Sequence, residues 1–220
     1  MEYAVLGGFA VQSLAGAAVS RPRERLELKN YIHRVEMSYR NVRTLHAAFT
    51  QVYSADGDRR VESGAVELER GGRMRWHYQS PQQKLFIADG KNLILYVPAE
   101  RQMTRSREKT SGDVRVPLSL LLSRVKLGKV FSSIEFANRD LPHPVGNRIL
   151  RALPKGGSQS GYSQVLIELD PELNIRRLVI SYAEGGTMDF RFTHIVRNAP
   201  LPRSAFIFNP PAGTEIIDEP

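Results

Sequence analysis

The sequence contains no cysteine, and this absence excludes several kinds of chemistry. A disulfide framework, a cysteine-based zinc site, a thiol nucleophile and a lipidated N-terminal cysteine all need that residue. The strings HExxH and GxGxxG and the P-loop pattern are missing as well, and the five histidines are too scattered for a local two-histidine metal motif. We therefore expect no catalytic residues and no metal ligands in this chain.

Two SxxK strings are the nearest approach to a catalytic motif. They span Ser106–Lys109 and Ser123–Lys126, but the KTG-type element of penicillin-recognising enzymes is absent. The sequence therefore favours a protein that is not an enzyme. A lipid-modifying hydrolase that uses one of the serines stays a distant alternative, because a site assembled from distant residues leaves no local motif.

Long apolar runs are rare, and the one that occurs stands at the N-terminus. Residues 3–19 carry no charge and end in a zone of small residues, which is typical of a signal peptide. The usual basic start is missing, and Glu2 stands in its place. We expect residues 1–20 to be a signal peptide for export. A buried N-terminal helix and a retained membrane anchor stay open, although a membrane span needs about 20 apolar residues.

The rest of the composition is that of an ordinary globular protein. The chain has 220 residues, of which 41% are hydrophobic and 25% charged, and this length fits one domain over residues 21–220. Lys and Arg number 31 against 23 Asp and Glu, and basic residues are dense between Arg101 and Lys129. We interpret these basic residues as part of a solvated face of the protein. The alternative is that they attract anionic lipid head groups or an acidic protein partner. No nucleic-acid motif accompanies it, so we expect no nucleic-acid partner.

Hydrophobic periodicity divides the chain into a helical part and a strand part. From Pro22 to Phe49, apolar residues recur every three or four positions, which predicts one long amphipathic helix. After Gln51 the period changes to two, which predicts strands with one apolar face. Asp56-Gly57 and Asp89-Gly90 are expected hairpin turns. The expected strands are Val66–Glu69, Arg73–Tyr78, Lys84–Ala88, Leu93–Val97, Gln164–Asp170, Ile175–Ala183, Thr187–Ile195 and Ala205–Asn209.

Three segments interrupt the strands. The polar stretch Arg101–Gly112 predicts a loop, and the stretch Pro142–Ser160, rich in Pro, Gly and Ser, predicts a surface loop. Between them, Val114–Phe131 predicts a short helix that either covers the sheet as a lid or packs on it as an ordinary helix. Its expected apolar face consists of Leu118, Leu121, Leu122 and Val125. A helix followed by an antiparallel meander predicts an α+β domain.

Three groups of residues occur in an order and spacing that are typical of one protein family. The first is LHAAFTQ at 45–51, the second runs from Gly64 through MRWHY at 74–78 to Gln102, and the third is FIFNPPAG at 206–213. Together they resemble the LolA family, the periplasmic outer-membrane lipoprotein carriers. The resemblance extends from Leu28 to the C-terminus.

The resemblance implies a fold and a function. The fold is a single-domain, unclosed antiparallel β-barrel whose apolar concave face is covered by helices that act as a lid over a cavity. In such carriers the acyl chains of a lipoprotein bind in that cavity. An inner-membrane lipoprotein-releasing ABC transporter supplies the cargo, and an outer-membrane receptor takes it. The implied protein is a monomeric periplasmic chaperone without a cofactor.

The resemblance also suggests roles for individual residues. Arg70 matches an arginine that hydrogen-bonds the lid and holds the empty carrier shut, although Gly71 replaces the proline that usually follows it. Met74 matches an apolar position linked to contact with a partner. The residues expected in the lid or against the lipid are Leu118, Leu121, Leu122, Val125, Trp76, Tyr78, Tyr96 and Phe49. A periplasmic protein of the same fold that binds another lipid or hydrophobic ligand is the main alternative.

Overall fold

The computed structural model describes residues 15–107 and 126–219. In these ranges twelve strands form one sheet, in the order β12-β6-β5-β4-β3-β2-β1-β11-β10-β9-β8-β7. All neighbours are antiparallel except β12 and β6. The strands are β1 (Thr44–Ala55), β2 (Asp58–Glu69), β3 (Arg73–Ser80), β4 (Lys84–Ala88), β5 (Asn92–Val97), β6 (Gln102–Arg107), β7 (Phe131–Phe136), β8 (Arg148–Pro154), β9 (Tyr162–Leu169), β10 (Ile175–Tyr182), β11 (Thr187–Arg197) and β12 (Glu215–Asp218). The sheet does not close, because β12 and β7 are its two edges, and this confirms the predicted fold class.

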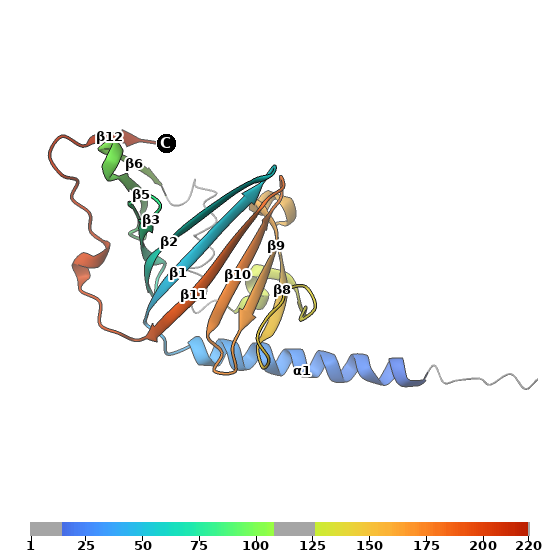
Figure 1. Cartoon of the computed structure of the whole chain (residues 1–220). Coiled ribbons are helices and arrows are strands. Elements are labelled where there is room, and N and C mark those ends of the chain that lie inside the picture. The colour runs from blue at the N-terminus through green and yellow to red at the C-terminus, as the bar shows by residue number, and fades with distance from the viewer. Residues whose placement is uncertain (1–14, 108–125, 220) are drawn as a thin grey trace, which may run out of the picture.

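Helices are few in the described ranges. The long helix α1 (Ala15–Tyr39) runs across the lower ends of β8 to β11 in Figure 1. The short α3 (Leu127–Val130) precedes β7, and three 3₁₀ turns lie at Pro98–Glu100, Gly157–Ser160 and Arg203–Phe206. No described helix combines the length and the apolar character that a membrane span requires. Residues 15–20, within the expected signal peptide, already belong to α1.

The sheet is strongly curved, and ring contacts across it show the concave side. Trp76 on β3 and Phe190 on β11 are separated in the sheet by β2 and β1, which places them about 14 Å apart in a flat sheet with a strand spacing of about 4.8 Å. Their ring centroids are nevertheless 5.3 Å apart. The strands must therefore curl toward each other on this face, as Figure 1 also shows.

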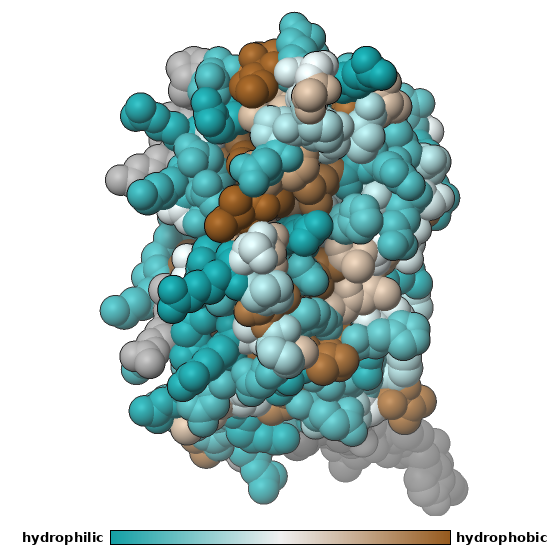
Figure 2. Space-filling view, turned by 90° about the vertical axis from the view of Figure 1, so that its left-hand side faces the viewer, coloured by the Kyte–Doolittle hydropathy of each residue, from teal (hydrophilic) through white to brown (hydrophobic). Residues whose placement is uncertain are grey.

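The alternation of side chains separates this concave face from the outer one. The main core lies on the concave side and includes Phe86 and Leu93, whereas their neighbours Ile87 and Ile94 belong to a second cluster on the opposite face. The chain between β11 and β12 covers that second cluster with Phe206. Figure 2 views the molecule from the side on which this C-terminal segment lies, and apolar side chains form a band there among hydrophilic ones. Ile207 and Ile216 are exposed apolar residues of this segment and of β12.

Two hairpin turns form as predicted. Asp56 and Gly57 join β1 to β2 with φ angles of 52° and 86°, which fits the preference of Asp-Gly for such turns. At the second turn, the carboxylate of Asp89 accepts hydrogen bonds from the main-chain N–H groups of Lys91 and Asn92. Burial opposes ionisation of Asp89, but its hydrogen bonds with Asn92 and Lys91 outweigh that effect and hold its pKa below the usual value. Asp89 is therefore a turn residue.

The predicted helix Pro22–Phe49 is correct as far as Tyr39 and wrong beyond it. The helix ends at Tyr39, and β1 begins at Thr44. Leu45 and Phe49 fit a helical spacing, but together with Ala47 they also fit the two-residue period of a strand, and all three are buried. Long-range pairing decides between the two patterns, because Arg43 N–H donates to Asn198 Oδ1 and Phe49 pairs with Phe192 on β11.

Three further expectations need correction. Most of the predicted loop Arg101–Gly112 that the structure describes is strand β6, whose single buried side chain, Met103, gives a weak alternation signal. The predicted loop Pro142–Ser160 contains β8, in which Ile149 and Leu150 are fully buried. The segment Ala205–Asn209 forms no strand, since it begins in a 3₁₀ turn and lies across the outer face.

Candidate functional site

An aromatic cluster occupies the centre of the concave face. Phe49 on β1 contacts Trp76 and Tyr78 on β3 edge-to-face, with ring centroids 4.8 Å and 5.0 Å apart. Phe190 and Phe192 on β11 approach Trp76 from the other side, at 5.3 Å and 6.3 Å. These geometries are the favourable ones for aromatic pairs, and the five rings offer a large apolar surface. We call Phe49, Trp76, Tyr78, Phe190 and Phe192 the aromatic cluster.

Helix α1 covers one end of this face. Tyr31, Val35 and Tyr39 recur every four residues and are buried in the same core as the aromatic cluster. The hydroxyl oxygen of Tyr39 accepts a hydrogen bond from the main-chain N–H of Ile175, and the guanidinium of Arg197 lies 4.5 Å from the centre of its ring. Burial raises the pKa of the Tyr39 hydroxyl, so this group stays neutral. The helix is thus fixed to β10 and β11 by its last two turns.

Arg70 ties the end of β2 to the end of α1. Its Nη2 atom donates hydrogen bonds to the main-chain carbonyls of Tyr39, at 3.3 Å, and of Arg40, at 2.6 Å, and also to that of Val42. The last carbonyls of a helix have no partner within the helix, so a cation placed there satisfies them and complements the helix dipole. The sequence singled out Arg70, and the structure places it against α1.

A second helix contact lies next to the start of α3. The main-chain N–H of Leu127 donates to the Glu36 carboxylate of α1, with 2.8 Å between the two atoms. This hydrogen bond joins the first turn of α3 to the last turn of α1. α1 therefore contacts the chain on both sides of the concave face.

A buried polar network borders the aromatic cluster at the end away from α1. Tyr78 Oη donates to Gln51 Oε1 at 2.8 Å, and Gln51 Nε2 donates to Glu62 Oε2 at 3.1 Å. Lys84 forms an ion pair with Glu62, and its Nζ atom lies 4.7 Å from the centre of the Tyr78 ring. Gln51 and Glu62 are 6% and 7% exposed, which is unusual for such residues. We call Gln51, Glu62, Tyr78 and Lys84 the polar network.

The structure unites only some of the residues singled out in the sequence. Phe49, Trp76 and Tyr78 lie together in the aromatic cluster, and Met74 lies beside them, where its Sδ atom accepts a hydrogen bond from Trp76 Nε1 at 3.3 Å. Met74 is fully buried, so its side chain does not form a surface here. The expected lid residues Leu118, Leu121, Leu122 and Val125 lie outside the described residues.

Tyr96 does not join the site. It follows Leu95 on β5 and points to the opposite face of the sheet, where its ring packs on Phe208 with centroids 4.9 Å apart. The alternation Leu93, Leu95 against Ile94, Tyr96 could have placed it outside, had the concave face been assigned first.

Sequence reasoning missed several residues of the site. Phe190 and Phe192 alternate within the predicted strand Thr187–Ile195, and this alternation was the available signal. The polar network left no local signal, because Gln51, Glu62 and Lys84 come from three strands.

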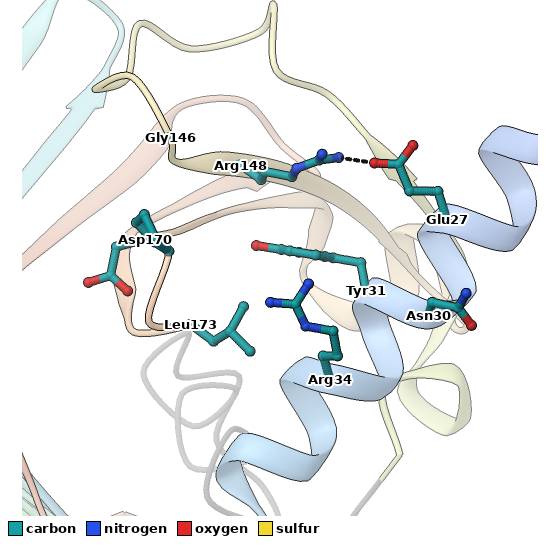
Figure 3. Close-up of a pocket in the computed structure, with 9 residues that line it drawn as sticks. Glu27, Asn30, Tyr31, Arg34, Gly146, Arg148, Asp170 and Leu173 are labelled. Atoms are coloured by element: carbon teal, nitrogen blue, oxygen red, sulfur yellow. Dashed lines mark ion pairs between the residues drawn. The ribbon is translucent and has the colours of Figure 1, made fainter.

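A separate cavity of about 300 Å³ lies between α1 and the strand ends, and Figure 3 shows it in close-up. Arg34 and Arg148 lie 5.9 Å and 5.6 Å from the centre of the Tyr31 ring, and Arg148 Nη1 pairs with Glu27 at 2.6 Å. Asp170 also lines the cavity. These charged groups set the cavity apart from the apolar concave face. Within the described ranges, no group of three or more potential metal ligands occurs.

Comparison with known proteins identifies the family. The family model described as outer membrane lipoprotein carrier protein LolA matches residues 40–209. The chain belongs to this family. The match begins directly after α1 and contains every residue of the aromatic cluster and of the polar network.

Individual relatives support the assignment. An outer-membrane lipoprotein carrier protein of Dechloromonas aromatica is 30% identical over 82% of this chain and 84% of its own length. One of Bordetella bronchiseptica is 27% identical over 96% of this chain and 94% of its own. A solved structure of an uncharacterized conserved protein from Thermus thermophilus shares the fold, with a TM-score of 0.55 and 12% identity over 88% of this chain and 99% of that one. LolA proteins are carriers and not enzymes, which agrees with the expectation from the sequence.

Proposed function

We propose that this protein is a periplasmic chaperone that carries lipoproteins from the inner to the outer membrane. Its membership of the LolA family carries the proposal, because the relatives are named as outer-membrane lipoprotein carriers. The same names support a periplasmic location. The acyl chains of the cargo bind the concave face, where the aromatic cluster gives the apolar surface that they need.

The physical requirement for such a carrier is strong. Removing one CH₂ group from water is worth about 0.8 kcal/mol, so a lipoprotein with several acyl chains does not cross an aqueous compartment unaided. The carrier must offer an apolar surface to its cargo and keep that surface covered when it is empty, because large exposed apolar patches cause association. A concave sheet face with a movable cover meets both requirements.

Arg70 and α1 are the described parts of this cover. In the proposal, the hydrogen bonds from Arg70 to the carbonyls of Tyr39 and Arg40 hold α1 in the empty state and break when cargo enters. From the sequence, Leu118, Leu121, Leu122 and Val125 contribute the apolar face of the lid. A charged side chain there, as in Leu121→Glu, is expected to lower cargo binding without unfolding the protein.

The proposed partners follow from the same role. An inner-membrane lipoprotein-releasing ABC transporter supplies the acylated cargo, and an outer-membrane receptor accepts it. Met74, at the position linked to partner contact in the family, is the proposed contact residue. Because its side chain is fully buried, that contact requires part of the cover to open.

Identification of the bound molecule tests the proposal. The tagged protein is purified from the periplasm without detergent, and its bound species are analysed by mass spectrometry. We expect a lipoprotein that carries acyl chains. Recovery of a free phospholipid, a glycolipid or a pigment in its place would contradict the proposal and favour a protein of the same fold with another hydrophobic ligand.

A further inference from the structure

The polar network is an unusual feature of an otherwise apolar face. Glu62 and Lys84 form an ion pair beside the aromatic cluster, and the side chain of Glu62 is 8% exposed and that of Lys84 19%. An ion pair in such a place gains little stability over apolar residues of similar size, because both charges lose their hydration. Stability alone therefore does not explain why charged residues stand here.

The network occupies one end of the aromatic cluster. Along β1, Thr44 lies near the end of α1 and Gln51 lies seven residues further, which is about 23 Å at about 3.3 Å per residue. Phe49 lies between them on the same face as Gln51. The concave face thus runs from α1, across the aromatic rings, to the polar network.

The donors and acceptors of the network are unequally used. Both oxygens of Glu62 accept hydrogen bonds, one from Lys84 and one from Gln51, and Gln51 Oε1 accepts from Tyr78. An ammonium group carries three N–H donors. Among the described residues, Lys84 Nζ finds a single acceptor, Glu62, together with the face of the Tyr78 ring. The network therefore has N–H groups to donate to a ligand, and its acceptors are occupied.

The charges of the network indicate which acceptor it fits. Glu62 and Lys84 compensate each other, so the site carries no net charge, and the carboxylate of Glu62 repels another anion at this distance from Lys84. A neutral acceptor attached to an apolar chain fits both the donors and the neighbouring aromatic rings. An acyl ester or amide carbonyl has this chemistry.

We propose that the polar network binds the carbonyl oxygen of an acyl ester or amide, with Lys84 as the donor and the fatty chain lying along the aromatic cluster. The inference rests on the proposed function, in which that carbonyl belongs to an acylated lipoprotein. A diacyl glycerophospholipid carries the same carbonyl chemistry. The network would fix how far the chain enters and where the polar part of the ligand begins.

Ester and ether forms of one ligand test the proposal. A synthetic lipopeptide with two ester-linked acyl chains is compared with its dialkyl ether analogue of equal chain length, which lacks the carbonyls. We expect the wild-type protein to bind the ester form about tenfold more tightly, because the ether form cannot accept the charge-assisted hydrogen bond from Lys84. A tenfold difference corresponds to about 1.4 kcal/mol. Equal affinities for the two forms would overturn the proposal.

Variants place the effect in the network. Glu62→Gln with Lys84→Met removes both charges together, so no unpaired buried charge remains. We expect this protein to lose the preference for the ester form over the ether form. Lys91→Met, at the exposed β4–β5 turn, is the matched control and should keep the preference. A double variant that keeps the preference would show that the carbonyl is bound elsewhere.

Two further measurements distinguish failure of the proposed carbonyl site from failure of the proposed function. If the double variant does not fold, Lys84→Gln replaces it, because the glutamine amide is a neutral donor that can still hydrogen-bond Glu62. We expect this single variant to have a weaker preference for the ester form. An unchanged preference would overturn the proposed site. The ester and ether forms of a phosphatidylcholine are measured in parallel. An ester preference with this lipid alone would support the carbonyl site and contradict the lipoprotein cargo. A wild-type protein that binds none of the four ligands would contradict the proposed function itself.

Discussion

The guanidinium of Arg70 donates a hydrogen bond to the main-chain carbonyl of Arg40, with 2.6 Å between Nη2 and the oxygen. Arg70 directly follows the end of β2, and Arg40 directly follows the end of α1, so the bond joins two elements that are not consecutive in the chain. Because the same Nη2 atom also reaches the carbonyls of Tyr39 and Val42, α1 cannot leave the sheet without breaking these bonds. Arg70 therefore couples the position of the helix to the sheet.

Replacement of Arg70 is the first test of this coupling. Arg70→Leu is expected to lower the free energy of unfolding by about 1–3 kcal/mol, because it leaves partly buried helix carbonyls without a donor. Hydrogen exchange should accelerate in the last two turns of α1. The control Arg75→Leu removes a half-exposed arginine whose ion pair with Glu67 spans 4.0 Å, and it should cost less than about 1 kcal/mol. Equal effects of the two substitutions would contradict the assignment.

Gly64 gives a prediction about the sheet itself. A Cβ atom added at this position would lie 1.9 Å from the main-chain oxygen of His77 on β3, so Gly64→Ala must displace the backbone next to Phe49 and Tyr78. We expect a loss of about 1–3 kcal/mol in chemical denaturation. Gly128→Ala, in α3, meets no atom within 4 Å and should not destabilise the protein. An equally stable Gly64→Ala protein would show that β2 and β3 are not in such close contact.

Substitutions at Tyr96 and Phe49 test which face of the sheet binds the ligand, because the two side chains lie on opposite faces. Tyr96→Ala removes the ring contact with Phe208 on the outer face and should lower stability by about 0.5–3 kcal/mol while the affinity of the folded protein for a lipopeptide stays unchanged. Phe49→Ala opens the aromatic cluster and should lower both stability and affinity. Titration with a fluorescent lipopeptide measures the affinities. A loss of affinity in Tyr96→Ala would place the ligand on the outer face.

Asp170 predicts how stability depends on acid. Burial alone would raise its pKa, but hydrogen bonds from Asn174 and Arg176 outweigh it and lower the pKa below the usual value. In the unfolded chain this carboxyl titrates near pH 3.9, so its contribution to stability is fully present above about pH 4 and is lost as the pH falls through the lower folded pKa. Asp170→Asn should show a smaller loss of stability than the wild type does as the pH falls below about 4. The control is Asp56→Asn at the exposed hairpin tip, and an acid profile of Asp170→Asn equal to the wild-type profile would contradict the prediction.

Sequence patterns predicted the centre of the sheet well and its margins poorly. Met74, Trp76 and Tyr78 alternate with polar residues, and such a strand is visible locally because one face is buried. β12 has four exposed residues, and its position is set by pairing with β6, which is more than a hundred residues away. A strand of this kind depends on long-range hydrogen bonds and leaves almost no local pattern.

The candidate site shows the same limit. The resemblance to the family points to Trp76 and Phe49, but the two-residue period at 45–49 coincides with a helical spacing, and the sequence pattern therefore favours a helix at Phe49, which lies on β1. The polar network requires knowledge of which strands are neighbours. Glu62 faces Gln51 only because β1 and β2 pair in one particular register, and Lys84 joins them through the pairing of β3 with β4.

The central claim is that acyl chains lie on the concave face, and the chain offers a direct probe of it. Trp76 is its one tryptophan and stands in the middle of the aromatic cluster. A lipopeptide with brominated acyl chains should quench the fluorescence of Trp76, because bromine quenches only at close range, and an unbrominated lipopeptide should restore it by competition. Saturable binding of the brominated lipopeptide with no change in Trp76 fluorescence would contradict the account.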